Sequence, residues 1–241
     1  MQLLQIEKKS PPSPPSPCHY IKGKYWQFRY FFASDLNEGE LENFLSRGWR
    51  KFGYYYFRPD CDDCRKCIPI RIDVNNFTPS KSQKRIINKN RDIHVNYTPL
   101  SYSDKIFELY KKHSLVRFNQ DKTDKDDFIT SFFMPSCPSF LSKYFFNNRL
   151  AGVGFLDKCD SGLSSVYFIF DTDYDKYSLG TYSVLSEIKH TSYLKKRYYY
   201  LGYYIEECPG MAYKGRFLPF ELYNWDNREW ITPETFSNTT P

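Results

Sequence analysis

The sequence has no long apolar segment and no recognisable leader for secretion. Mean hydropathy is −0.65, and apolar stretches such as residues 166–170 are far shorter than the roughly 20 residues of a membrane-spanning helix. The first nine residues lack the apolar core and the small-residue cleavage site of a secretory signal. We therefore expect a cytoplasmic protein without a membrane span.

Several kinds of catalytic motif are missing as well. The chain has no Gly-x-Ser-x-Gly elbow, no Walker A sequence and no complete dinucleotide fingerprint. Its four histidines form neither a triad pattern nor a zinc-protease pattern. Covalent hydrolysis and ATP or NAD chemistry are therefore disfavoured, and the absence of a fixed internal period argues against a solenoid.

What is abundant is aromatic and basic character. The 241 residues include 22 Tyr and 21 Phe, enough apolar material for a substantial core. Lys and Arg outnumber Asp and Glu by 34 to 28, and this net charge of +6 permits an anionic partner. Residues 81–91 hold five basic side chains and no acidic one, which is typical of either an anion site or a solvated helix face.

The chain divides into four segments by composition. Residues 11–17, PPSPPSP, favour extended polyproline II geometry, so we expect a disordered leader over residues 1–17. We place a cysteine-containing N-terminal domain at residues 18–98, a second domain at residues 99–230 and a tail at residues 231–241. The boundary between the two domains falls near residues 92–104.

Hydrophobic periodicity predicts a mixture of helices and strands in both domains. In the first domain we expect a helix within residues 38–50 and strands at 54–57 and 68–74. The second domain reads strand, strand, loop, helix, strand, with the elements at residues 150–156, 163–170, 171–179, 180–194 and 198–205. Residues 121–127 carry four aspartates and are predicted to be a loop.

Three cysteines, Cys61-x-x-Cys64-x-x-Cys67, lie in a turn between two predicted strands. This spacing can present thiolates to one zinc ion or to an iron–sulfur cluster. Cys18 is the natural fourth ligand, with His19 as its competitor. The alternative is that these residues are small buried side chains or redox-labile thiols. The odd total of seven cysteines argues against a disulfide framework.

Six ordered motifs resemble the aminoacyl-tRNA–protein transferases of the N-degron pathway, which include bacterial aspartate/glutamate leucyltransferases and arginyltransferases. They are GWRKFG (48–53), FRPDCDDCRKCIPIRI (57–72), FTPSKSQKR (77–85), LSSVYFIFD (163–171), SLGTY (178–182) and YLGYYI through MAYK (200–205, 211–214). The resemblance covers about residues 18–221, which is nearly the whole chain.

The resemblance implies an enzyme that transfers an amino acid from charged tRNA to the α-amino group of proteins beginning with Asp or Glu, creating a degradation signal. It implies an α/β (α+β) fold, with a cysteine-bearing N-terminal lobe followed by a GNAT-like acyltransferase lobe. The family's cysteines correspond to Cys18, Cys61, Cys64 and Cys67, which in relatives have been linked to zinc or iron–sulfur binding. The chemistry itself requires no cofactor, because the donor is an activated ester.

Three groups of residues are candidates for this reaction. Cations and polar donors suited to an acidic first residue are Arg71, Ser80, Gln83, Lys84 and Arg85. Candidates for the chemical step, at predicted strand ends, are Tyr167, Asp171 and Tyr203, for which packing or capping is the alternative. Candidates for the tRNA and donor, at a helix N-terminus and beyond it, are Ser178, Gly180, Thr181 and Lys214.

Two alternatives to leucyl transfer stay open at this level. The same acceptors could receive arginine, although residues 18–23 resemble the leucyl branch more closely. In a different class, the chain could be a non-catalytic, metal-containing RNA-binding module, because its basic run and aromatic residues suit nucleic acid. The partners expected from the main hypothesis are aminoacyl-tRNA and proteins with N-terminal Asp or Glu, and no membrane.

Overall fold

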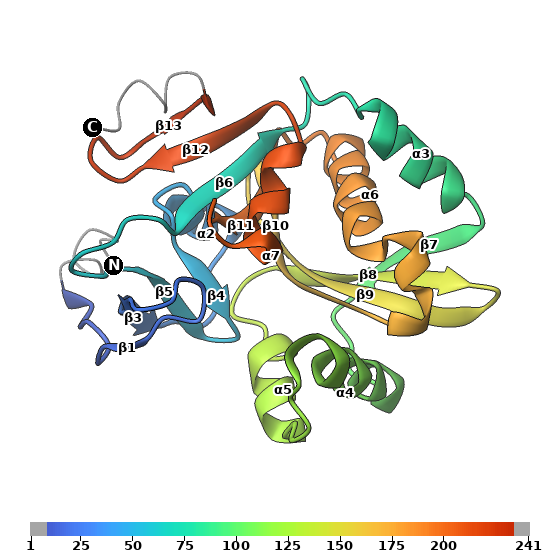
Figure 1. The fold of residues 1–241 in the computed structure, drawn as a ribbon, viewed down its shortest axis with the longest axis horizontal. Coiled ribbons are helices and arrows are strands. Elements are labelled where there is room, and N and C mark those ends of the chain that lie inside the picture. The colour runs from blue at the N-terminus through green and yellow to red at the C-terminus, as the bar shows by residue number, and fades with distance from the viewer. Residues whose placement is uncertain (1–8, 234–241) are drawn as a thin grey trace.

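The computed structural model describes residues 9–233, and its main feature is an eight-stranded sheet (Figure 1). The strand order is β13-β12-β6-β11-β10-β9-β8-β7. These strands are β6 (Ile68–Asp73), β7 (Ile93–Pro99), β8 (Ser139–Phe146), β9 (Arg149–Lys158), β10 (Gly162–Phe170), β11 (Tyr198–Tyr204), β12 (Phe220–Asn224) and β13 (Glu229–Ile231). Strands β10 and β11 pair parallel, and the other neighbours pair antiparallel.

A smaller three-stranded sheet lies beside it, in the order β3-β5-β4. It comprises β3 (Phe28–Phe32), β4 (Arg50–Phe52) and β5 (Tyr55–Pro59), and is covered by α2 (Glu38–Leu45). Asn37 and Glu40 form a capping box that starts α2, and Leu41, Phe44 and Leu45 are buried against Trp49. The expected helix within residues 38–50 and the strand near 54–57 are thereby confirmed.

The proline-rich segment runs along this small sheet. The Ser13 backbone N–H donates to Phe28 O at 2.7 Å, and the Tyr30 N–H donates to Pro11 O at 3.4 Å. Strand β1 (Ser16–Pro17) then pairs with β2 (Tyr25–Trp26). The structure thus holds residues 11–17 of the expected leader by backbone pairing, which proline permits at a sheet edge. Residues 1–8 lie outside the described part of the chain, as do residues 234–241 of the expected tail.

Helices cover both faces of the large sheet. Helix α6 (Leu179–Tyr193) connects β10 to β11 and packs with α3 (Lys81–Lys89) on one face (Figure 1). Helices α4 (Asp104–Phe118) and α5 (Lys125–Phe132) lie on the other. Successive side chains of β9 point to opposite faces of the sheet: Leu156 packs in the cluster with α6, whereas Phe155 packs in the cluster with α4 and α5.

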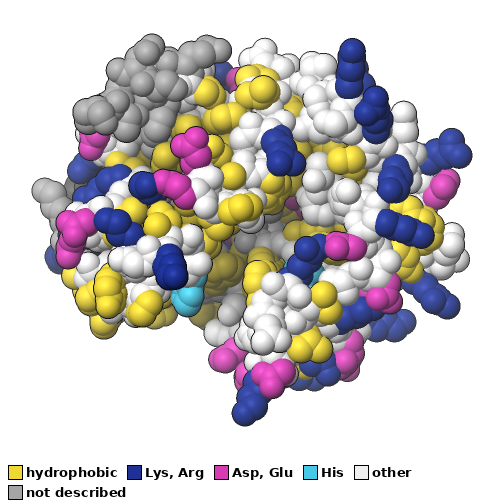
Figure 2. All heavy atoms as spheres, in the orientation of Figure 1, with side chains coloured by type: hydrophobic (Ala, Val, Ile, Leu, Met, Phe, Trp, Pro, Cys, Tyr) yellow, Lys and Arg dark blue, Asp and Glu magenta, His cyan; other side chains and the backbone are white. Residues whose placement is uncertain are grey.

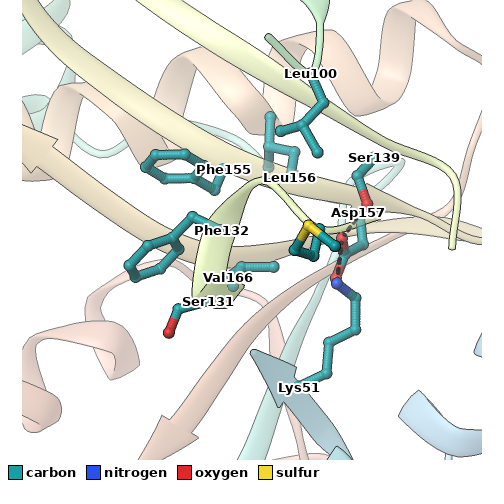
Figure 3. Close-up of a pocket in the computed structure, with 10 residues that line it drawn as sticks. Lys51, Leu100, Ser131, Phe132, Ser139, Phe155, Leu156, Asp157 and Val166 are labelled. Carbon is teal, nitrogen blue, oxygen red and sulfur yellow. Dashed lines mark hydrogen bonds and ion pairs between the residues drawn. The ribbon is translucent and has the colours of Figure 1, made fainter. Parts of the chain in front are cut away.

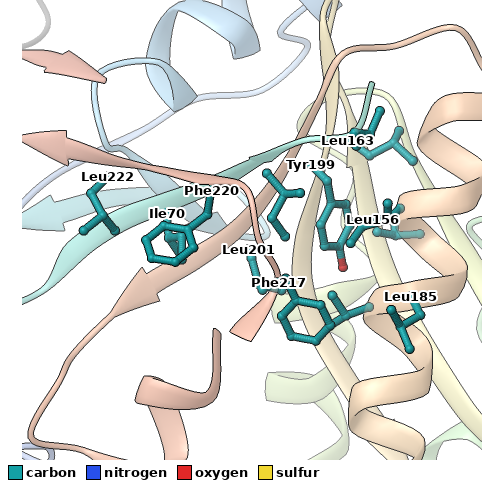
Figure 4. Close-up of a cluster of buried hydrophobic side chains, with 13 residues drawn as sticks. Ile70, Leu156, Leu163, Leu185, Tyr199, Leu201, Phe217, Phe220 and Leu222 are labelled. Atoms are coloured by element: carbon teal, nitrogen blue, oxygen red, sulfur yellow. The ribbon is translucent and has the colours of Figure 1, made fainter. Parts of the chain in front are cut away.

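The core on the α6 face joins residues from both halves of the sequence. In Figure 4, Ile70 of β6 lies beside Phe220 of β12, and Leu201 and Tyr199 of β11 lie between Ile70 and Leu185 of α6. Strands β6 and β7, placed in the N-terminal domain by the sequence, therefore belong to the same sheet as the later strands. The predicted strands at residues 68–74, 150–156, 163–170 and 198–205 and the helix from residue 180 are confirmed.

One predicted loop contains the start of a helix. Within residues 121–127, Asp124 caps α5, and its carboxylate accepts the backbone N–H groups of Asp126 and Asp127. Acidic residues in a first helical turn are favourable because they offset the helix dipole. The short connecting helices are η1 (Thr172–Tyr177), α7 (Pro209–Ala212) and η2 (Tyr213–Arg216). None of the helices within residues 9–233 has the length and apolar character that crossing a membrane requires.

A buried carboxyl group lies between α6 and the sheet. Glu187 accepts hydrogen bonds from Ser142 Oγ (2.7 Å), from Tyr144 OH (3.4 Å) and from the Tyr199 hydroxyl. Burial raises the pKa of Glu187 to about 7, although these hydrogen bonds act in the opposite direction. The folded protein therefore holds a proton here that the unfolded chain releases at lower pH.

We expect Glu187→Gln to change how stability depends on pH. Because the folded pKa lies above the unfolded value, the wild-type protein loses stability from this group as pH rises from about 4.5 to 7. Relative to the variant, the loss between pH 5 and pH 8 is on the order of 3 kcal/mol. Urea unfolding of both proteins at the two pH values measures it.

Glu38→Gln is the matched control for this measurement. Burial raises the pKa of Glu38, but the hydrogen bonds and charges of Lys158 and Lys196 outweigh it and lower the pKa, so the residue is largely ionised in both states above pH 5. Its stability difference from the wild type is expected to stay nearly constant over the same range. Parallel pH profiles for the wild type and Glu187→Gln would contradict the assignment.

Candidate active site

The parallel pair β10–β11 opens after three residues. Only Gly162–Ser164 pair with Tyr198–Tyr200. At this point each strand also has a register shift against its outer neighbour, between Ser165 and Tyr167 of β10 in its pairing with β9, and between Tyr200 and Gly202 of β11 in its pairing with β6. Such bulges turn strands away from their neighbours. Backbone groups from Ser165 onward are thus free of the β10–β11 ladder and available to other partners.

Two buried cations enter this opening from other elements. The Arg50 guanidinium of β4 donates to the Ser165 carbonyl, and Lys214 Nζ of η2 donates to the Tyr203 carbonyl at 2.8 Å. The two side chains flank Gly202, whose φ of +91° lies in the region that favours glycine. A Cβ at Gly202 would lie 3.4 Å from Lys214 Nζ and 3.9 Å from Arg50 Nη2. We call Arg50, Gly202 and Lys214 the cationic cradle.

No carboxylate of residues 9–233 forms an ion pair with the cradle, although the charge of Asp157, which pairs with Lys51, favours protonated Arg50 from a greater distance. Within residues 9–233, neither Arg50 nor Lys214 forms an ion pair, although both are more than nine-tenths buried. Burial, together with the adjacent Arg50 charge, lowers the pKa of Lys214 to about 7. Buried charges are normally paired, so this arrangement is costly unless an anion binds there.

The next residue of β4, Lys51, is also buried, but its charge is paired with a carboxylate. Lys51 Nζ lies 3.1 Å from Asp157 Oδ1, which also accepts Ser139 Oγ at 2.7 Å (Figure 3). Burial opposes the charge, but the Asp157 carboxylate raises the pKa of Lys51. Phe132, Phe155 and other apolar side chains line the small pocket beside this pair, as Figure 3 shows.

The three residues predicted for the chemical step lie on or near β10 and β11. Tyr167 is half-buried on β10 and stacks on Phe132 with ring centroids 5.3 Å apart. Tyr203 is buried on β11, and its hydroxyl donates to Gly48 O at 3.0 Å. Asp171 follows β10, caps η1 by accepting the Asp173 N–H, and forms an ion pair with Lys112. The structure therefore places Tyr167 and Tyr203 on the two strands that border the opening.

The predicted acceptor residues are in two places. Arg71 on β6 pairs with Glu221 at 2.6 Å and lies between the rings of Tyr198 and Trp230, at 3.7 and 4.4 Å from their centroids. The others belong to the start of α3: Ser80 and Gln83 form its capping box, and Lys84 and Arg85 are exposed on its surface. Among residues 9–233, Arg71 forms its hydrogen bonds with Glu221 and Tyr200, and none with this group.

The predicted tRNA residues are divided in the same way. Ser178, Gly180 and Thr181 form the start of α6, whereas Lys214 lies in the cradle. The end of the basic helix α3 contacts the segment just before α6: Lys89 Nζ donates to Lys176 O at 2.5 Å and Asn90 Nδ2 to Tyr177 O at 2.9 Å. Figure 2 shows Lys and Arg side chains gathered over this side of the molecule.

The four predicted metal ligands converge from two segments. Burial is the main cause that raises the pKa of Cys61 and Cys67, and the neighbouring thiols add to it. Cys18 is among these neighbours although it is distant in sequence. Together these effects bring the pKa of Cys67 to about 12. The Gln27 N–H donates to Cys61 Sγ at 3.4 Å. Four thiols are a donor set that suits zinc or iron–sulfur. No three Cys, His, Asp or Glu side chains of residues 9–233, however, are arranged closely enough to hold a metal ion.

Arg50 and Gly202 were not predicted as site residues. Both occur in motifs noted in the sequence, GWRKFG and YLGYYI. Neither motif indicates that Arg50 is buried without an ion pair, or that Arg50 and Gly202 lie beside Lys214. A second pocket in the described chain lies at the β7–β8 edge, away from these residues, and is lined by Asp92, His94, Asn96, Phe145, Asn147 and Asn148.

Comparison with known proteins matches nearly the whole chain to one family. Residues 16–85 match the N-terminal model, and residues 105–224 the C-terminal model, of arginine-tRNA-protein transferase. An aspartate/glutamate leucyltransferase of Saccharophagus degradans is 36% identical over 225 residues, which cover 90% of this chain and 94% of the relative. One from Helicobacter hepaticus is 32% identical over 212 residues, with coverages of 85% and 88%.

Solved structures are similar only at a distance. The C-terminal domain of a putative lysylphosphatidylglycerol synthetase from Agrobacterium fabrum has a TM-score of 0.45 at 13% identity and covers 73% of this chain and 54% of its own. L-PGS from Bacillus licheniformis has a TM-score of 0.47 at 9% identity, with coverages of 59% and 48%.

We expect the two buried lysines to differ in what they contribute to stability. Lys51→Met leaves the Asp157 carboxylate buried without its cation and should cost roughly 3–5 kcal/mol. Lys214→Met loses the hydrogen bond to the Tyr203 carbonyl and a weak one to Met211 Sδ, but it also removes a buried charge that has no ion pair, so stability should change by no more than about 1 kcal/mol. Urea denaturation at pH 7 compares them, and equal losses would contradict the absence of a partner for Lys214.

Proposed function

The chain belongs to the arginine-tRNA–protein transferase family and is an aminoacyl-tRNA–protein transferase, and from this premise we propose that it transfers leucine from leucyl-tRNA to the α-amino group of proteins beginning with Asp or Glu. The observation that carries the proposal is the 36% identity with an aspartate/glutamate leucyltransferase over 90% of the chain. The product would then carry a leucine that marks it for degradation, as the resemblance implies.

The reaction is the aminolysis of an ester. The neutral α-amine attacks the aminoacyl carbonyl carbon, the new C–N bond forms, and the bond to the ribose oxygen of the terminal adenosine breaks. The amine loses a proton and the ribose hydroxyl gains one. Because an α-amino group has a pKa of about 7.7 to 8.0, a fraction is neutral near pH 7 and no covalent enzyme intermediate is required. Orientation and stabilisation of the oxyanion are the enzyme's main tasks.

We place this reaction at the opening between β10 and β11, in a lobe that we propose to be GNAT-like. The support is the parallel pair that separates after Ser164 and Tyr200, with α6 as its crossover. Unpaired backbone N–H groups at such an opening are suitable donors to a developing oxyanion. Tyr167 and Tyr203 border it and keep their predicted role near the chemistry.

The surface formed by α3 and the start of α6 is our proposed tRNA-binding face. Lys84, Arg85 and Lys89 project from one exposed helix, which contacts the residues just before Ser178. Lysine and arginine side chains bind phosphates without regard to sequence. Because its donor is aminoacyl-tRNA, we propose that the protein works in the cytoplasm.

Transfer of label from charged tRNA tests the proposal. The protein is incubated with tRNA carrying labelled Leu, Arg, Phe or Met and with peptides that differ only in their first residue. We expect leucine to be joined to Asp and Glu peptides and not to Lys, Arg or Ala peptides. Arginine on the same acceptors would replace the donor assignment, and intact tRNA binding without transfer would favour a non-catalytic RNA-binding module.

We further propose that Cys18, Cys61, Cys64 and Cys67 hold zinc or an iron–sulfur cluster. The support is that Cys18 and Cys64 lie close enough to Cys61 and Cys67 to add to the effect of burial in raising the pKa of these two thiols, an effect that a bound cation would offset. Such a group would tie the β1–β2 hairpin to the turn before β6 and is given no part in the transfer step.

Metal content tests this second proposal directly. We expect anaerobically purified protein to contain either about one zinc per chain or iron with visible absorption that bleaches on reduction. Cys61→Ser should lose most of it, whereas Cys137→Ser, whose thiol is buried in another cluster, should retain it. Elemental analysis measures zinc and iron, and the visible spectrum detects a cluster. Protein that contains neither metal would contradict the proposal.

A further inference from the structure

The unpaired charges of the cationic cradle call for an explanation that its role in the fold does not provide. Arg50 and Lys214 are buried side by side around Gly202, and each donates to a backbone carbonyl. The nearby carboxylate of Asp157 is bonded to Lys51, and that of Glu221 to Arg71. Two adjacent like charges with no carboxylate partner weaken the folded state, so their presence points to a ligand.

The space beside Gly202 lies against both cations. Apart from adjoining residues, only Lys214 Nζ and Arg50 Nη2 lie within 4 Å of the point where a Gly202 side chain would begin. A carboxylate beside Gly202 would therefore have both cationic side chains as its nearest non-adjoining neighbours. Charge-assisted hydrogen bonds of this kind are the strong ones, and a guanidinium beside an ammonium suits a carboxylate.

The position of the cradle indicates which carboxylate binds there. In an N-terminal Asp or Glu, the side-chain carboxylate and the attacking α-amine are attached to the same short residue. A site that reads the carboxylate must therefore border the place where the amine attacks. The cradle does so, because Gly202 and Tyr203 lie on β11 at the opening that exposes Ser165 of β10. Figure 2 shows this face hollowed near its centre.

We propose that Arg50 and Lys214 bind the side-chain carboxylate of the acceptor protein's first residue, with Gly202 leaving the space for it. This inference rests on the proposed function for the identity of the acceptor. It assigns the selection of acidic acceptors to residues far apart in the chain, in place of the group expected from the sequence. In that group Glu221 already pairs with Arg71, and Lys84 and Arg85, the residues expected to meet the carboxylate, are exposed on α3 with Ser80 and Gln83 at its start.

Peptide binding tests the inference without requiring transfer. Kd is measured on the full chain by fluorescence anisotropy for two peptide pairs that differ only in the first residue, Asp against Asn and Glu against Gln. The wild type should prefer the acidic member of each pair. Arg50→Gln and Lys214→Met should each weaken binding of the acidic peptides by about 30-fold or more and leave the amide peptides unchanged, which removes the preference.

Three further variants make the result specific. Arg216→Gln removes an exposed cation two residues from Lys214 and should keep the preference. Arg50→Lys retains the charge and should keep part of it. Gly202→Ala fills the cradle with a methyl group while both cations remain, so it should weaken acidic peptides selectively even if a charge variant fails to fold.

Two outcomes would overturn the inference. One is a preference for acidic peptides that survives in Arg50→Gln and Lys214→Met, especially if Arg85→Ala abolishes it instead. The other is an equal loss for acidic and amide peptides, which would mean that the cations shape the site without reading the side chain. Failure of the proposed function is seen separately, as absence of leucine transfer by the wild-type protein from charged tRNA.

Discussion

The separation of β10 from β11 is the constraint on which the rest of the structure depends. A parallel pair that continued past Ser164 and Tyr200 would satisfy its own backbone groups and leave no place for a substrate. That pairing ends where β10 has a register shift against β9 and β11 has one against β6, inside a sheet that is otherwise continuous. Side chains from other elements bind the backbone there: Arg50 of β4 donates to the Ser165 carbonyl, and Lys214 of η2 donates to the Tyr203 carbonyl.

The small sheet is essential to this arrangement because it supplies one wall of the opening. Strand β4 places consecutive residues in different roles: Arg50 reaches the Ser165 carbonyl, and Lys51 pairs with Asp157. The Tyr203 hydroxyl bonds back to Gly48, which links the same segment to β11. A lobe that the sequence sets apart by its cysteines is therefore continuous with the candidate active site.

Most buried or half-buried cations in the described chain are matched by carboxylates, as Lys51 is by Asp157 and Arg71 by Glu221. These pairs explain how so basic a chain folds around polar strands. Arg50 and Lys214 are exceptions, and they occur where β10 and β11 part. A protein that binds an anion must keep some cations without an internal partner. The cost of leaving these cations unpaired is tolerated because the rest of the fold is stable enough.

The sequence by itself determined the family, the principal strands and helices, and the residue types available for chemistry. Apolar periodicity is a local property, so β6, β10, α6 and β11 could be predicted within a few residues. Only the tertiary structure decided which cations are paired, because Arg50, Ser165, Gly202 and Lys214 are brought together by contacts across most of the chain. It also placed β6 and β7 in the later sheet, since strand pairing depends on contacts that no short stretch of sequence contains.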